Sequence, residues 1–308
     1  MMLHVLLLTV GFVFLVKGAD WFVEGAAGIA KKLGIPQLVI GLTIVAMGTS
    51  MPEAAVSITS ALSGSAGISI GNVVGSNILN ILIILGITAV PTNVRIQKTT
   101  FRYEIPFMIG ITIILMAFGI TGNQITFLEG ILFWLLFLIF LGYLFVISKK
   151  GSVQDEEEIK ELPLWKGVLG IIIGGILVVK GSDFAVEGAT EIARYFGMSE
   201  RFIGLTIVAF GTSLPELVTS VTAARRGNAD IAIGNIVGSN IFNILFVIGT
   251  TALICNVPFD QKFVIDTIVA IFSGVLLWAG TIRYKELRKN CGIVMLLCYA
   301  GYFIYLCK

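Results

Sequence analysis

Charged residues and histidine are scarce in this 308-residue chain. Only 13% of its residues are charged and one is histidine, whereas 56% are hydrophobic and the mean hydropathy is +0.97. A soluble globular protein carries roughly twice that share of charge. The chain is therefore expected to be an integral membrane protein whose surface faces the lipid bilayer. Its net charge of +2 is scattered, which argues against nucleic-acid binding.

The chain also lacks the motifs of several functional classes. Its four cysteines all lie after residue 254 and form no Cys-x-x-Cys pair, so buried apolar side chains are expected rather than a zinc site or disulfide. No Gly-x-x-x-x-Gly-Lys-Ser/Thr loop is present to bind ATP. No pair of base and nucleophile suggests an enzyme, and no cofactor is expected.

An internal repeat organises the chain. Residues 17–90 match residues 180–253 without gaps, with about 42 of 74 positions identical. Each half then continues with two further apolar segments. Because about 20 residues cross a bilayer as a helix, the sequence predicts ten spans: Leu3–Ala30, Leu38–Leu62, Ile68–Val90, Ile105–Ile120, Ile125–Ile147, Val168–Ala193, Phe202–Ala224, Ile231–Ile254, Phe263–Ala279 and Gly292–Leu306.

Five spans per half is an odd number, so the second copy enters the membrane from the opposite side. The expected fold is all-α, with ten transmembrane helices as two inverted five-helix repeats, residues 1–148 and 166–308, and a cytoplasmic linker at 149–165. With the N-terminus outside, about fifteen Lys and Arg residues lie in inner loops and about four in outer loops. This bias predicts a multi-pass protein of the cell membrane. The lipid bilayer is an expected partner, and the sequence is compatible with a monomer.

One motif interrupts the second expected span of each half. Gly48-Thr49-Ser50-Met51-Pro52-Glu53 returns as Gly211-Thr212-Ser213-Leu214-Pro215-Glu216. Glycine and proline weaken the helix and free backbone carbonyls, which must then line a cavity walled by protein. Acidic side chains at membrane depth are costly and mark functional sites. A proline-kinked packing helix would explain the glycine, proline and serine, but not the repeated glutamate.

The next span of each half carries a second polar set on one helical face. These residues are Asn72, Ser76 and Asn80, repeated as Asn235, Ser239 and Asn243. Such a face often serves only helix packing, and the glycine pairs Gly71/Gly75 and Gly234/Gly238 would allow a close approach. Next to a cavity that holds carboxylates, ion binding is the favoured interpretation.

All of these candidate ligands are oxygen atoms, which select hard cations such as calcium, magnesium, manganese and sodium. Many oxygens in a flexible site favour calcium over magnesium. Two ionised glutamates repel one another in a dry pocket, and one divalent ion or several monovalent ions relieve that repulsion. Such mutually exclusive occupancy is what antiport requires. Inverted repeats with broken helices at the membrane midplane are the general plan of secondary transporters.

On these residues the sequence resembles the sodium/calcium exchanger family of the cation/calcium antiporter superfamily, prokaryotic type. Gly48–Glu53 with Gly71–Asn77, and their copies, match the alpha repeats of that family. The resemblance implies exchange of several sodium ions for one calcium ion. It also implies the ligands. Calcium would be bound by Glu53 and Glu216, which also share in sodium binding, with the backbone carbonyls of Thr49 and Thr212. Flanking sodium ions would be bound by the side chains of Ser50, Ser213, Ser76 and Ser239 with the backbone carbonyls of Ala46 and Ala209, and Asn80 and Asn243 would lie between these sites.

In some members of the family, including potassium-dependent ones, aspartate occupies the position that matches Asn243.

Besides sodium/calcium exchange, the residues leave open an antiporter of protons and calcium or another divalent cation, in which the two glutamates titrate. Ser50 and Ser213 favour the sodium mechanism, since protons need no additional oxygen ligands. A passive cation channel is a third interpretation, although channels use charge rings and filters rather than buried paired acids.

Overall fold

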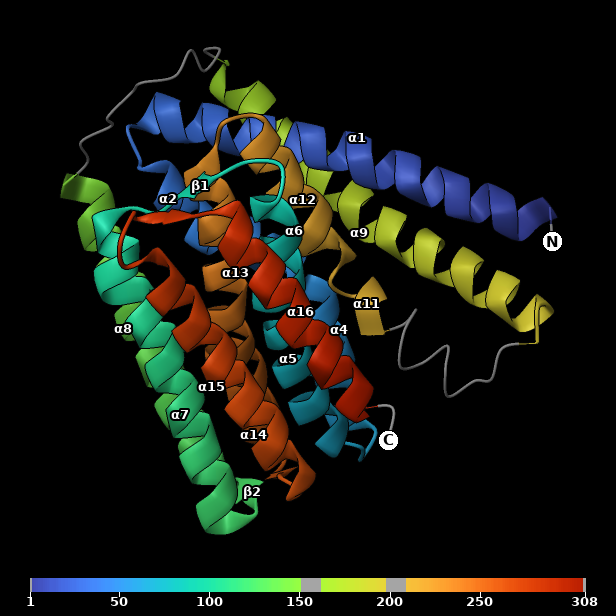
Figure 1. Ribbon diagram of the computed structural model, residues 1–308, viewed down its shortest axis with the longest axis vertical. Helices are drawn as coiled ribbons and strands as arrows, with labels where there is room; N and C mark the ends of the chain where they lie inside the picture. Colours follow the sequence, from blue (N-terminus) through green and yellow to red (C-terminus); the bar gives the residue numbers. More distant parts are fainter. Residues whose placement is uncertain (1, 151–161, 198–208, 307–308) are drawn as a thin grey trace.

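The structure is a computed structural model that describes residues 2–150, 162–197 and 209–306 (Figure 1). It is largely helical, as the sequence predicts, and its other regular structure is two pairs of two-residue strands. Residues 151–161 of the expected linker and residues 202–208 of the expected span Phe202–Ala224 lie outside the described residues.

The helices of the first half follow one another in the order expected from the apolar segments. They are α1 (Met2–Leu33), α2 (Gln37–Ile40), η1 (Gly41–Val45), α3 (Ala46–Thr49), α4 (Met51–Leu62), α5 (Gly67–Leu79), η2 (Asn80–Leu85), α6 (Gly86–Ala89), η3 (Thr100–Glu104), α7 (Ile105–Gly122) and α8 (Phe127–Lys150). The segments labelled η are π-helical. Strands β1 (Val94–Arg95) and β2 (Gln124–Ile125) lie between them.

The second half repeats this order. Its helices are α9 (Leu164–Tyr195), α11 (Ala209–Gly211), α12 (Leu214–Arg225), α13 (Ala229–Phe242), η5 (Asn243–Ile248), α14 (Gly249–Ile254), α15 (Lys262–Thr281) and α16 (Lys289–Leu306), with strands β3 (Val257–Pro258) and β4 (Glu286–Leu287). Helix α9 begins two residues inside the expected linker, directly after Pro163, which is its N-cap residue and has the extended backbone angles usual at that position.

Eight helical segments in the described residues are long and apolar enough to cross a bilayer. A ninth candidate is the bent pair Gln37–Thr49 and Met51–Leu62, whose two parts make an angle of 49°. These helices make the chain a multi-pass membrane protein. The first and sixth expected spans are longer than predicted, because α1 and α9 each run for 32 residues.

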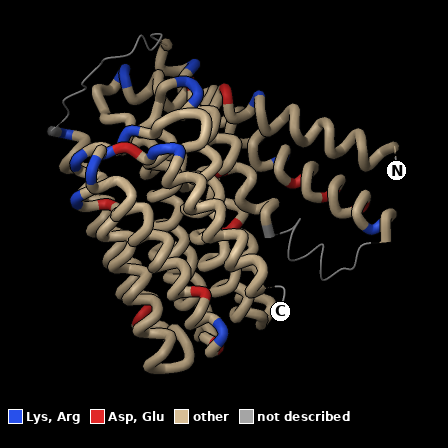
Figure 2. Tube along the Cα trace, in the orientation of Figure 1, with Lys and Arg blue, Asp and Glu red and all other residues tan. Residues whose placement is uncertain are grey.

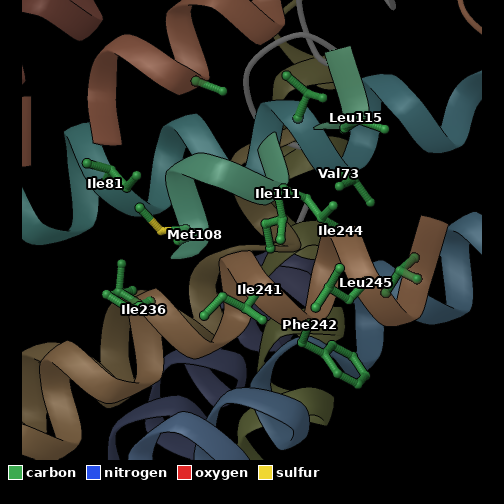
Figure 3. Close-up of a cluster of buried hydrophobic side chains, with 14 of the residues drawn as sticks. Val73, Ile81, Met108, Ile111, Leu115, Ile236, Ile241, Phe242, Ile244 and Leu245 are labelled. Atoms are coloured by element: carbon green, nitrogen blue, oxygen red, sulfur yellow. The ribbon is translucent and has the colours of Figure 1, made fainter. Parts of the chain in front are cut away.

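Two of the spans form the centre of the molecule. In the most apolar stretches of Gly67–Ala89 and Ala229–Ile254, 72% and 94% of the residues are buried, against 33% or fewer in the other continuous spans. Apolar side chains from these two spans and from α7 pack together, among them Val73, Met108, Ile111 and Ile241 (Figure 3). The polar sets of the two halves are therefore carried by the two most enclosed helices.

Helices α1 and α9 lie against each other along the flank of the molecule (Figure 1). Glycines at seven-residue intervals bring their backbones into contact. A Cβ added at Gly174 would lie 2.5 Å from the backbone nitrogen of Phe22, and one at Gly181 would lie 2.7 Å from that of Leu15. The contacts run antiparallel, so the first helix of each half packs on its own counterpart.

The short strands join the two halves at two separate places. β1 pairs with β4 and β2 pairs with β3, both antiparallel. β1 and β2 lie at opposite ends of the helical bundle (Figure 1). Each half thus contributes one strand to each end.

Candidate ion-binding site

The break in the first copy lies at Ser50. Helix α3 ends at Thr49 and α4 begins at Met51, with Ser50 between them at φ −86° and ψ 10°. Pro52 lies in the first turn of α4 and has no N–H, so the Gly48 carbonyl loses its usual helical donor. The chain resumes as a helix at once, and this places Glu53 in the first turn, where the helix dipole favours an acid.

The second copy has the same local geometry. Ser213 precedes α12 at φ −90° and ψ 3°, Pro215 lies in the first turn, and Glu216 follows it. The two breaks therefore arise from the same residues at the same spacing. Glu53 and Glu216 are both fully buried, at 0% exposure.

The two glutamates meet across the halves. The hydroxyl of Ser50, three residues before Glu53, donates to Oε1 of Glu216 at 2.7 Å. The two carboxyl groups interact with each other, and Thr212 interacts with the Glu53 carboxyl as Thr49 does with that of Glu216. The first break thus supplies a hydroxyl, that of Ser50, to the glutamate of the other half. The hydroxyl of Thr49 donates to Asn235 Oδ1 of the other half at 3.0 Å.

Serines of the central helices complete the surroundings of each carboxyl group. Ser76 Oγ donates to Glu53 Oε1 at 3.3 Å, and Ser239 Oγ lies 3.4 Å from Glu216 Oε1. Ser239 also lies 3.4 Å from the carbonyl oxygen of Ala46, which brings that carbonyl to the same place. Ala209, its counterpart, is the first residue of α11.

The predicted polar face of the central helices divides into two roles. Asn72 donates to the backbone carbonyl of Glu53 and to Ser57 Oγ, at 3.1 and 2.9 Å. Asn235 makes the matching contacts with the Glu216 carbonyl and Ser220, at 3.4 and 2.9 Å. These two asparagines tie each central helix to the helix that carries the glutamate, so helix packing is the better interpretation for them.

Asn80 and Asn243 differ from these packing residues. Both are fully buried, and each begins a π-helical segment, η2 and η5. π-Helical turns are concentrated at functional sites. Oδ1 of each is buried and has no hydrogen-bond partner among the described residues.

We use the name polar cluster for ten of these side chains: Thr49, Ser50, Glu53, Ser76 and Asn80 with Thr212, Ser213, Glu216, Ser239 and Asn243. The segments η2 and η5, which begin at Asn80 and Asn243, pack against α12 and α4, the helices that carry Glu216 and Glu53. Five of its buried oxygens have no partner in the described part of the chain: Glu53 Oε2, Glu216 Oε2, Asn80 Oδ1, Asn243 Oδ1 and Ser213 Oγ. Buried polar atoms are normally satisfied. An unsatisfied group of oxygens that includes two carboxylates is what a hard cation requires.

The described residues contain no group of three or more His, Cys, Asp or Glu side chains that could hold a metal. The polar cluster offers only two carboxylates, and its other ligands are neutral. A site with few charged ligands binds a cation more weakly than a dedicated metal site does. This donor set suits an ion that enters and leaves rather than a resident metal.

Comparison with known proteins agrees with this chemistry. The family model described as sodium/calcium exchanger protein matches residues 3–146 and 166–308. The chain belongs to the sodium/calcium exchanger family.

Its relatives within that family are similar over nearly their full length. The chain is 36% identical to the inner membrane protein YrbG of Escherichia coli, covering 99% of this chain and 96% of the relative. It is 32% identical to the sodium/calcium exchanger MaX1 of Methanosarcina acetivorans, with coverage of 98% and 97%. A solved structure of the sodium-calcium exchanger NCX_Mj, soaked with 2.5 mM Na+ and 1 mM Sr2+, superposes with a TM-score of 0.86 at 33% identity, covering 99% and 98% of the two chains.

This member of the exchanger family also has a buried acid that the sequence analysis did not single out. Glu104, at the end of η3, is 1% exposed, and its Oε1 accepts a hydrogen bond from the hydroxyl of Tyr143 on α8. In the second half, Tyr302 on α16 donates to Asp266 on α15 at 2.8 Å. A carboxyl–tyrosine pair thus links the last two spans of each half.

Two further asparagines were missed as site residues although they belong to the repeated motif. Asn77 and Asn240 are 4% and 1% exposed and lie three residues before Asn80 and Asn243. Their recurrence in both copies was the available signal. Their contacts could not be predicted, because each one reaches a residue of the other half.

Proposed function

We propose that this exchanger-family protein is a secondary antiporter that moves sodium ions and calcium in opposite directions by alternating access. One observation carries the proposal: each half donates a fully buried glutamate to a single cluster, in which Ser50 of one half bonds Glu216 of the other. Ionised, the pair holds two negative charges. One calcium ion or two sodium ions would neutralise them, so the two cargoes exclude each other.

The proposed ligands follow from the unsatisfied oxygens. Glu53 and Glu216, with the carbonyls of Thr49 and Thr212, would take calcium at the centre and share in sodium binding. Ser50, Ser213, Ser76 and Ser239, with the carbonyls of Ala46 and Ala209, would form flanking sodium sites. The contact of Ser239 with both Glu216 and the Ala46 carbonyl supports this, because one hydroxyl touches a central and a flanking ligand. The oxygens of Asn80 and Asn243 would lie between these sites.

The proposed topology is ten spans in two inverted repeats, residues 1–148 and 166–308, joined by the linker 149–165. The strand pairs support this topology, because two strands that pair lie on the same side of the membrane and must be separated by an even number of crossings. Between β1 and β4 the described residues contain five crossings, an odd number that would put the strands on opposite sides of the membrane. Because β1 pairs with β4, the pairing supports a further crossing between Tyr195 and Ala229. The pairing of β2 with β3 gives the same result.

We also propose that the N-terminus is outside the cell membrane. Lys and Arg gather at the end of the molecule that holds β1 (Figure 2). The basic residues next to β1 and β4 are Arg95, Lys98, Arg102, Arg283, Lys285, Arg288 and Lys289. Cytoplasmic loops carry such excess positive charge. Three crossings separate the N-terminus from β1, so the N-terminus lies on the other side.

Calcium uptake into reconstituted vesicles tests the function. Vesicles loaded with sodium should take up calcium against its gradient, whereas vesicles loaded with protons or with a symmetric salt should not. Uptake driven by a proton gradient alone would identify a proton/calcium antiporter instead. Equal flux without any gradient would identify a channel.

Two charge-removing variants test the site. Glu53→Gln and Glu216→Gln should each abolish sodium-driven calcium uptake, because each removes one of only two charges in the polar cluster. Glu187→Gln, the same change at an exposed position of α9, is the matched control and should transport normally. Retained calcium flux in both cluster variants would overturn the assignment.

A further inference from the structure

Asn77 and Asn240 join the two halves at the centre of the molecule. The side-chain amide of Asn77 donates to the backbone carbonyl of Asn240, and that of Asn240 donates to the backbone carbonyl of Asn77, both at 3.1 Å. These residues lie on α5 and α13, the two most enclosed helices. The contact is reciprocal, so each half holds the other in the same way.

This contact determines which way the amide groups face. A backbone carbonyl can only accept a hydrogen bond, so each of the two asparagines must turn its Nδ2 toward the carbonyl and its Oδ1 away from it. Oδ1 of Asn240 then accepts from Asn80 Nδ2 at 2.9 Å. Oδ1 of Asn77 accepts from Asn243 Nδ2 at 3.1 Å.

The orientation of Asn77 and Asn240 also fixes the orientation of Asn80 and Asn243, which belong to the polar cluster. Because Asn80 and Asn243 turn their Nδ2 atoms toward these acceptors, their Oδ1 atoms must face the other way. Both Oδ1 atoms are buried and have no partner among the residues that the structure describes. The Oδ1 and Nδ2 ends of an asparagine amide are nearly equal in size, so packing alone would not decide which of the two orientations the side chain adopts. A turned amide would present N–H groups, which repel a cation.

We propose that Asn77 and Asn240 are positioning residues that make Asn80 and Asn243 cation ligands by fixing the direction of their amides. The proposal rests on the proposed ion site. Two backbone carbonyls, which cannot change their polarity, set the direction of four side chains across the boundary between the halves. Neither Asn77 nor Asn240 needs to touch an ion itself.

The arrangement also couples position 77 to position 243. An aspartate at position 243 has no N–H to give Asn77 Oδ1, so a carboxylate oxygen would face an amide oxygen. Turning Asn77 to relieve this would break its bond to the Asn240 carbonyl. Conversely, a carboxylate presents oxygen in either orientation, so an aspartate at position 243 no longer needs a partner to direct it.

Calcium binding to purified protein, measured by calorimetry, tests the proposal with four proteins: wild type, Asn77→Ala, Asn243→Asp and the double variant. In the wild-type background, Asn77→Ala should weaken calcium binding about fivefold to tenfold, the scale of one hydrogen bond. In the Asn243→Asp background the same change should cost nothing or strengthen binding. Asn240→Ala with Asn80→Asp is the matched pair in the other half and should behave alike.

Equal weakening by Asn77→Ala in both backgrounds would overturn the proposal, because a residue that serves only packing has no reason to depend on position 243. A lower thermal transition with unchanged calcium affinity would overturn it as well. If Asn77→Ala gives no folding transition, Asn77→Ser replaces it in the same scheme. The readout does not require sodium coupling, so calcium binding without sodium-driven uptake would refute the proposed antiport and still test the amides.

Discussion

We predict that the close approach of α13 to the bent helix of the first half sets the geometry of the proposed ion site, and Gly238→Ala tests this. A Cβ at Gly238 would lie 2.8 Å from Cα and O of Leu42 and from Cβ of Ala46. Carbon atoms pack best at about 3.5–4.0 Å. The two helices would therefore have to separate by about 0.7 Å or more.

That displacement acts directly on the polar cluster. Ala46 supplies a carbonyl that lies 3.4 Å from the hydroxyl of Ser239, the residue next to Gly238. Binding sites need their groups within about 0.5 Å of the productive geometry. Overpacking of this kind also costs about 1–3 kcal/mol of stability. We expect Gly238→Ala to lower the thermal transition and to weaken calcium binding about tenfold.

The assay is calcium binding and sodium-driven uptake, measured beside the thermal transition of the purified protein. Gly142→Ala on α8 is the matched control, because a Cβ built there has no described atom within 4 Å outside its chain neighbours and the local backbone of its own helix. It should leave calcium affinity unchanged and, as a glycine replaced within a helix, should not destabilise the protein. Wild-type calcium affinity in Gly238→Ala would refute the argument that this helix contact sets the geometry of the site.

Three further predictions follow from the contacts of the site and of Glu104. Acidification should raise the apparent KM for calcium, because protons and calcium compete for Glu53 and Glu216. Saturating calcium should then restore the transport rate. A KM for calcium that stays constant down to about pH 4.5, near the ordinary pKa of glutamate, would contradict this. Ser50→Ala removes the 2.7 Å hydrogen bond to Glu216 and should weaken calcium binding about tenfold. Ser213→Ala removes no hydrogen bond found among the described residues and should weaken calcium binding less. An equal loss of calcium affinity in the two variants would refute this difference between the two serines. Tyr143→Phe removes the hydroxyl that donates to the buried Glu104 carboxyl and should cost about 1–3 kcal/mol of stability. The cost should be measured as a lower thermal transition, which Glu104→Gln should not reproduce.

Much of the fold could be predicted from residues that act locally. The length of an apolar stretch decides whether it crosses a bilayer, and this holds for the described spans. Proline removes a backbone N–H and disfavours the helical conformation of the residue before it, so breaks near Ser50 and Ser213 could be expected from Pro52 and Pro215. The repetition of the motif also predicted that Glu53 and Glu216 lie within apolar spans and share one pocket.

The predicted polar face could not be resolved further by helical spacing. Asn72 and Asn80 were predicted to lie on one face of the same helix, yet Asn72 donates to the neighbouring helix of its own half, whereas Asn80 begins a π-helical segment and donates to Asn240 of the other half. Spacing says which residues share a face but not what lies opposite. The distinction between packing and ion binding depends on the neighbour that each side chain meets.

The sequence by itself predicted the eight continuous spans of the described residues, the duplication, the helix breaks and the two acids within the spans, because apolar length, self-similarity and the positions of proline and glutamate can be read from the sequence alone. Only the tertiary structure decided that Ser50 bonds the glutamate of the other half, 166 positions away. It likewise decided the direction of the Asn80 and Asn243 amides, which depends on partners 160 and 166 positions distant. Contacts between chain segments so far apart arise only when the two halves pack together, and local pattern carries no information about them.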